Sequence, residues 1–124
     1  MNRSLKVLGL LFVLGCVVAS CAHRPKTFNF GRYSEGERLF NKGDYPKAIR
    51  EYQAYIDEHP EGHLAVISQY YIAKSYAALG HTGEAKKAYQ EIIKRYPDVV
   101  WANFAQTQLK ELEQKQAQSP VPKK

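Results

Sequence analysis

The feature that most constrains the fold of this chain is an internal repeat with a period of 37 residues. Pro60 and Pro97 are 37 residues apart, and each follows an Ala-x-x-x-Tyr motif whose alanine lies 12 residues earlier, at Ala48 and Ala85. A glycine precedes each of these alanines by five residues. Self-similarity at such a period is typical of stacked supersecondary units, each of which buries its apolar face against the next.

Between these landmarks, apolar residues recur at the spacing of three and four residues that is typical of amphipathic helices. The spacing predicts helices near residues 33–42, 46–58, 63–79, 83–96 and 99–116, with no strand candidate of convincing length. Asp98 is expected to cap the last helix, which becomes polar toward its end and would close the stack. The fold class is therefore all-α, with two helix-turn-helix units and a C-terminal capping helix.

The repeat resembles the tetratricopeptide repeat, in which small, large, turn, alanine, aromatic and proline positions follow at fixed offsets. The matching positions are Gly36, Leu39, Gly43, Ala48, Tyr52 and Pro60 in the first copy and Ala73, Tyr76, Gly80, Ala85, Tyr89 and Pro97 in the second. Gly36 and Ala73 are expected where the partner helix crosses closely, and Gly43 and Gly80 where each hairpin turns. The resemblance implies a right-handed α-solenoid over roughly residues 33–116.

In the family that the chain resembles, the first helix of each hairpin lines a concave groove that binds peptides. The corresponding positions are Tyr33, Glu37, Phe40 and Asn41 in the first repeat and Ile67, Tyr70, Lys74 and Ala77 in the second. The alternative for each residue is packing between repeats, and the sequence leaves both open. Tyr33 and Glu37 stand where carboxylate-clamp members carry lysine and asparagine, so recognition of chaperone tails is not supported.

No pattern of residues predicts catalysis. The serines lack the context of a nucleophile elbow, and there is no glycine-rich phosphate loop. His59 and His63 stand four residues apart, but Pro60 and Gly62 between them predict a loop and not one helical face. We therefore expect a non-enzymatic protein with neither a metal nor a cofactor.

The N-terminus is expected to be an export signal. Residues 7–19 contain no charge and follow Arg3 and Lys6, and this stretch is too short to cross a membrane as a helix. The motif Val18-Ala19-Ser20-Cys21 resembles the lipobox of bacterial lipoproteins, which implies a signal at 1–20 and a covalent lipid such as palmitate on Cys21. Cys16 is a weaker acceptor, and an ordinary secretory signal is the alternative. Ala22 after the cysteine implies sorting to the outer membrane of a Gram-negative cell.

The net charge of +6 invites a nucleic-acid interpretation, but the distribution of charge argues against it. Residues 33–116 contain 11 basic and 12 acidic residues, so the basic excess lies in the signal, in a tether at 21–32 and in a tail at 117–124 that is expected to be disordered. Basic residues near a lipid anchor would lie beside anionic headgroups.

Together these features predict an outer-membrane-anchored periplasmic lipoprotein that scaffolds protein–protein contacts. It is similar to BamD-like outer-membrane-assembly lipoproteins and to TolA-binding coordinator repeat proteins. The alternative is a lipoprotein that binds an anionic envelope polymer, peptidoglycan or lipopolysaccharide. Two repeats are few for a stable stack, so we expect self-association or a stable protein partner.

Overall fold

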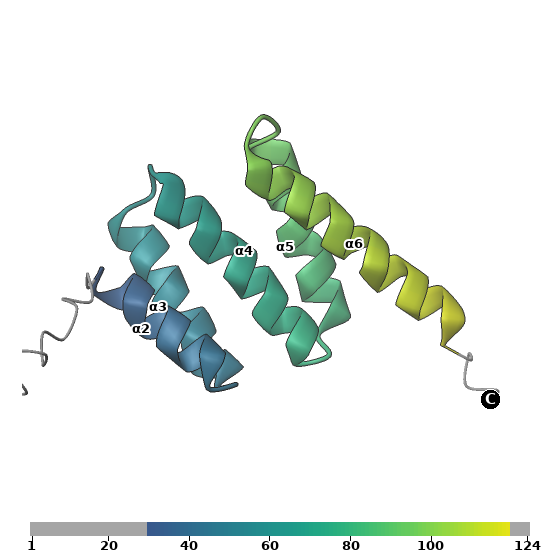
Figure 1. Ribbon diagram of the computed structural model, residues 1–124, viewed down its shortest axis with the longest axis horizontal. Coiled ribbons are helices and arrows are strands. Elements are labelled where there is room, and N and C mark those ends of the chain that lie inside the picture. The colour runs from purple at the N-terminus through teal and green to yellow at the C-terminus, as the bar shows by residue number, and fades with distance from the viewer. Residues whose placement is uncertain (1–29, 120–124) are drawn as a thin grey trace, which may run out of the picture.

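The computed structural model describes residues 30–119, which form a stack of helices without a strand (Figure 1). The helices in this part of the chain are α2 (Arg32–Asn41), α3 (Tyr45–Glu58), α4 (His63–Ala78), α5 (Thr82–Arg95) and α6 (Val100–Gln118). Their bounds differ from the expected ones by at most two residues. The prediction of an all-α fold with two hairpins and a final helix is confirmed.

The helices are arranged in two layers. Each helix packs against the next one along the chain, and α4 also contacts α2 and α6, whereas α3 and α5 do not contact each other within the described residues. In Figure 1, α2 lies in front of α3, and α6 in front of α5. Because α4 approaches both α2 and α6, whereas α3 and α5 do not approach each other, we call α2, α4 and α6 the inner layer and α3 and α5 the outer layer.

The first hydrophobic core lies between α2, α3 and α4, and consists of Leu39, Ala48, Tyr52 and Ile72. Gly36 lets α2 approach α3 closely, since a Cβ atom at this position would lie 2.9 Å from Cδ1 of the Tyr52 ring. Tyr52 is completely buried as a result. The expectation that residue 36 is small because the partner helix crosses there is confirmed.

The second core is larger and lies between α4, α5 and α6. It consists of Val66, Tyr70, Ala73, Ala85, Tyr89, Ile92, Ala105 and Leu109. Tyr89 occupies the place of Tyr52 and is also completely buried. Helix α4 contributes to both cores, through Ile72 to the first and through Ala73 to the second, so it joins the two repeats into one body.

Local signals in the sequence end and start the helices as expected in most places. Gly43 and Gly80 adopt the left-handed conformation, with φ of 79° and 75°, directly after α2 and α4. Asp44 caps α3, where its carboxylate accepts a hydrogen bond from the backbone N–H of Lys47 at 3.4 Å. The prediction that Asp98 caps the last helix is wrong. Val99 holds the cap position in an extended conformation, and α6 starts without a side-chain cap.

Both ends of the helical body extend beyond the expected bounds. Arg32, expected in the tether, is the first residue of α2, and its guanidinium donates to Glu58 at 2.6 Å and to Glu51 at 3.3 Å. Ala117 and Gln118, expected in the disordered tail, belong to α6. The predicted signal at 1–20, Cys21 and most of the tether lie outside the described residues, as do residues 120–124.

No helix within residues 30–119 is both long enough and apolar enough to span a membrane.

Candidate partner-binding face

The period of 37 residues places equivalent residues of α2, α4 and α6 at matching positions of the inner layer. Tyr33 of α2 corresponds to Tyr70 of α4. The same register continues into α6, where Phe104 corresponds to Ile67 of α4. We call the exposed side of α2, α4 and α6 the inner face.

Aromatic rings and one lysine fill the seam between α2 and α4. The Phe40 ring packs edge-on against Tyr71, with 5.0 Å between ring centroids. The Nζ atom of Lys74 lies 5.6 Å from the centroid of Phe40, 5.9 Å from that of Tyr70 and 5.8 Å from that of Tyr71. A cation at this distance from a ring face is attracted by its quadrupole. Lys74 therefore lies over the seam, with its ammonium group held among three rings.

Tyr33 is a packing residue as much as a surface one. Its ring contacts Tyr52 and Tyr55 edge-on, with centroid distances of 5.8 Å and 5.7 Å. Burial raises the pKa of Tyr33 to about 12, and the negative charge of Glu37 adds to the shift. The phenol is therefore neutral throughout the physiological pH range.

A second aromatic group lies where α4 meets the start of α6. The Tyr70 ring is 5.1 Å from Trp101 and 6.3 Å from Phe104, measured between centroids. Tyr70 is only 8% exposed and belongs to the second core, so for this residue the structure supports the packing alternative. Phe104, in contrast, is 48% exposed, and Val100 one turn earlier is 57% exposed.

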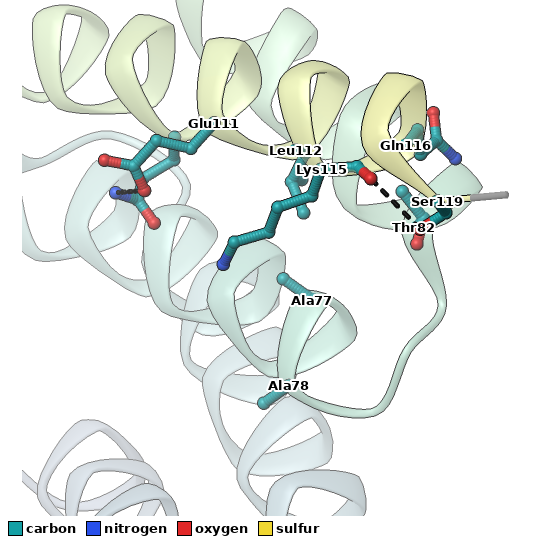
Figure 2. A pocket seen from close by; sticks show the side chains of 9 residues that line it. Ala77, Ala78, Thr82, Glu111, Leu112, Lys115, Gln116 and Ser119 are labelled. Carbon is teal, nitrogen blue, oxygen red and sulfur yellow. Dashed lines mark hydrogen bonds between the residues drawn. The ribbon is translucent and has the colours of Figure 1, made fainter.

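Farther along α6, a pocket of about 410 Å³ lies between α4 and α6 (Figure 2). Its lining residues are Ala77, Ala78, Thr82, Gln108, Glu111, Leu112, Lys115, Gln116 and Ser119. Ala77 corresponds to Phe40 in the repeat register. A methyl group therefore stands in this pocket, whereas an aromatic ring fills the seam between α2 and α4. Figure 2 shows the Lys115 side chain extending from α6 toward Ala77. The amide of Gln108 donates to the Glu111 carboxylate at 3.1 Å.

The structure distributes the eight predicted groove residues over three environments. Glu37 and Asn41 are exposed, Tyr70 is buried, and the half-buried ones are Tyr33, Phe40, Ile67, Lys74 and Ala77. Sequence reasoning missed the share that α6 contributes, namely Phe104, Glu111 and Lys115. The signal was present, because these residues lie 37 positions after Ile67, Lys74 and Ala78.

The three histidines within residues 30–119 lie at helix ends. His59 follows the last residue of α3 and packs its ring against Tyr55, with 4.9 Å between centroids, whereas His63 begins α4. His81 precedes α5 and stacks on Tyr76. Within residues 30–119, no three histidine, cysteine, aspartate or glutamate side chains come together in a way that could hold a metal ion.

Comparison with known protein families matches the tetratricopeptide repeat at residues 36–62 and 68–98. These two segments overlap most of the two helical hairpins, α2 with α3 and α4 with α5. Over these two segments the chain is similar to the tetratricopeptide repeat. Comparison with curated proteins gives no match.

Tetratricopeptide repeats mediate protein–protein interactions, and proteins built from them are generally non-catalytic scaffolds. The chain is therefore a protein-interaction scaffold whose partner is a protein. The inner face, with the exposed Phe104, the pocket between α4 and α6 and its charged side chains, is the candidate site for that partner.

Proposed function

We propose that this protein is a lipid-anchored scaffold of the periplasm, held at the outer membrane, whose inner face binds a segment of a partner protein during assembly of the cell envelope. The observation that carries the binding proposal is the continuity of the inner face across α2, α4 and α6 in one repeat register. Three helices in register present a surface that a partner segment can cross, with side chains of the same position facing it from each inner-layer helix.

Phe104 supplies an anchor on this face. A phenylalanine that is half exposed loses apolar surface to water when a partner covers it, and aromatic residues are enriched among those that dominate binding energy. Val100 and the neighbouring Trp101 extend the apolar area around Phe104. The adjacent pocket along α6 offers space for a partner side chain beside Ala77.

Position-specific cross-linking in cells tests the binding face. A photoreactive residue placed at Phe104 should form a discrete adduct with a partner protein, whereas the same residue at Gln90, which is exposed on α5 of the outer layer, should not. Phe104→Glu should abolish an adduct formed from Asn103, its exposed neighbour on α6, while the helix content stays unchanged. Equal adducts at the two positions would contradict a binding site on the inner face.

The anchor is proposed from the Val18-Ala19-Ser20-Cys21 motif, and palmitate labelling tests it. The wild-type chain should incorporate labelled palmitate and fractionate with the outer membrane, and Cys21→Ser should do neither. Cys16→Ser is the matched control and should leave labelling intact. Equal labelling of wild type and Cys21→Ser would reject lipidation at Cys21.

Binding of an anionic envelope polymer is separable from protein binding by its response to salt. Attraction between a basic surface and an anionic polymer weakens steeply as the salt concentration rises. The helical body has a net charge of −1 over residues 33–116, which favours a protein partner. Pull-down of peptidoglycan or lipopolysaccharide that is lost between low and high salt would favour the polymer instead.

A further inference from the structure

The inner face carries a row of charges that alternates in sign. Glu37 of α2, Lys74 of α4 and Glu111 of α6 are separated by exactly one repeat period each, so every inner-layer helix presents one charge at the same position of the repeat. We call these three residues the charge row.

Spacing along α2 places Glu37 on the inner face, and contacts place Lys74 and Glu111 there. Glu37 stands one turn after Tyr33 and one turn before Phe40, and the Lys74 ammonium lies over the Phe40 ring. Glu111 lines the pocket between α4 and α6 together with Ala77. The three side chains therefore lie along the path that a partner would follow from α2 to α6.

The electrostatic environment of nearby tyrosines agrees with this placement. Burial is the main cause of the raised pKa of Tyr33 and Tyr70. The negative charge of Glu37 adds to the shift at Tyr33, and that of Glu111 adds to the shift at Tyr70. Both carboxylates thus act on rings of the inner layer.

None of the three charges is neutralised by an ion pair within the described residues. All ion pairs of residues 30–119 fall within residues 32–58 of the sequence. None of them involves Glu37, Lys74 or Glu111. Glu111 accepts a hydrogen bond from the neutral amide of Gln108, which leaves its charge in place. The row is available to charges on a partner.

We propose that the charge row selects a partner segment in which an acidic residue is flanked on each side by a basic residue. This inference rests on the proposed binding of a protein segment to the inner face. Axes of packed helices lie about 8–10 Å apart, and an extended chain rises about 3.3 Å per residue. A segment that crosses the three helices in extended form therefore matches the row as basic-x-x-acidic-x-x-basic.

Lys74 is the centre of this recognition. The rings of Phe40, Tyr70 and Tyr71 hold its ammonium group at the seam, so the side chain loses less freedom on pairing than an unrestrained surface lysine. A partner that covers the seam also removes water from the pair, which strengthens the attraction. The acidic residue opposite Lys74 is therefore expected to matter more than either basic residue.

The same row argues against a second copy of this chain as the occupant. If two inner faces met around a two-fold axis through their centres, Lys74 would oppose the Lys74 of the other copy, and Glu37 would oppose Glu111. Both arrangements place like charges together, which costs energy. The occupant that fits is a different protein with the complementary order of charges.

Selection from a phage library of random 12-residue peptides tests the proposal, with the full chain immobilised in detergent. Wild type should enrich peptides with the order basic, acidic, basic at spacings of about three residues. The variant Glu37→Lys/Lys74→Glu/Glu111→Lys should enrich the inverse order. Lys74→Glu alone should weaken binding of a wild-type-selected peptide by at least about tenfold, and exchange of the peptide's acidic residue for lysine should restore it.

The outer layer provides a matched control, because Glu84, Lys87 and Glu91 of α5 have the same composition and are exposed. Inverting all three should leave the selected peptides unchanged. If peptides are enriched and need Phe104 but keep their charge order when the row is inverted, the charge selection is overturned and the binding face stands. If the full chain enriches no peptide over bare support, the proposed binding of a segment to the inner face is overturned as well.

Discussion

The two repeats share one sequence framework but are stabilised in different ways. The first repeat lies at the end of the stack and has a ten-residue first helix and an aspartate cap on α3. Surface ion pairs join its Arg32 to Glu51 and to Glu58. The second repeat has a sixteen-residue first helix that is packed on both sides. None of the ion pairs of residues 30–119 lies in the second repeat. Exposed ion pairs add little to stability, whereas buried apolar area adds much. We therefore expect the first repeat to open before the second.

Truncation of the two equivalent tyrosines should show this difference most strongly. Tyr52→Ala and Tyr89→Ala each remove a fully buried ring, and such changes cost about 3–5 kcal/mol. Tyr89→Ala should expose amides throughout α4, α5 and α6, whereas Tyr52→Ala should expose chiefly those of α2 and α3, as measured by hydrogen exchange with mass spectrometry. Identical exchange patterns in the two variants would show that the stack unfolds as a single unit.

Gly36→Ala tests the close approach of α2 to Tyr52 and should rank second. The new Cβ atom would lie 2.9 Å from the ring, and overpacking of this kind costs about 1–3 kcal/mol. Thermal unfolding followed by circular dichroism measures the effect. Gly83→Ala is the control, since a Cβ atom at that position meets nothing within 4 Å. This substitution should stabilise α5 by up to about 1 kcal/mol. A neutral Gly36→Ala would mean that the ring moves aside freely.

The buried hydroxyl groups of Tyr52 and Tyr89 have no hydrogen-bond partner within the described residues. Tyr52→Phe and Tyr89→Phe should therefore each stabilise the fold by about 1 kcal/mol in urea unfolding at pH 7. Tyr33→Phe is the comparison, because Tyr33 is partly exposed. A loss of stability in both buried variants would indicate that these hydroxyl groups are satisfied in solution.

The same tyrosines make stability depend on pH in the alkaline range. Burial raises the pKa of Tyr33 to about 12 and raises the pKa of Tyr52 and Tyr89 further, whereas an unfolded tyrosine ionises near pH 10. Stability is thus fully present below about pH 10 and is lost as the pH rises from there toward the folded pKa values. The double variant Tyr52→Phe/Tyr89→Phe should flatten this loss in urea melts from pH 9 to pH 12. An unchanged slope would assign the loss to other groups.

The caps should give the smallest effect. Asp44→Ala removes the side-chain acceptor at the start of α3 and should lower the melting temperature slightly, by less than Gly36→Ala. His81→Asp introduces an acceptor at the equivalent position before α5, where no side-chain cap exists, and should raise it. If both changes lower the melting temperature, the histidine contributes more through its stacking on Tyr76 than a cap would.

The repeat period predicted most of the fold because it records packing that recurs in each unit. The small residue at Gly36 could be explained before the structure was known, since a close crossing of the partner helix is a local requirement of each hairpin, whereas the contact with Tyr52 came from the structure. The cap of α6 could not be predicted in this way. Asp98 has the right chemistry, but the chain takes an extended conformation at Val99 and the helix begins one residue later than the aspartate could cap.

The candidate site was harder to predict because it depends on contacts between repeats. Tyr33 and Tyr70 hold the same repeat position, yet only Tyr70 has an aromatic neighbour on the next inner helix, Trp101, which buries it. The three rings around Lys74 come from two helices and could not be assigned to one lysine from spacing alone. Phe104 was missed because α6 was interpreted only as a cap.

The sharing of α4 between the two cores also determines the order in which the chain can fold. Most contacts join helices adjacent in sequence, so folding does not need distant ends to meet and can be fast. Yet the first core includes Ile72 of α4. During synthesis, in which the N-terminus appears first, this core cannot be completed until α4 has been made. Until then α2 and α3 expose the apolar face that α4 will cover, and this interval is when the nascent protein is most vulnerable to aggregation and proteolysis.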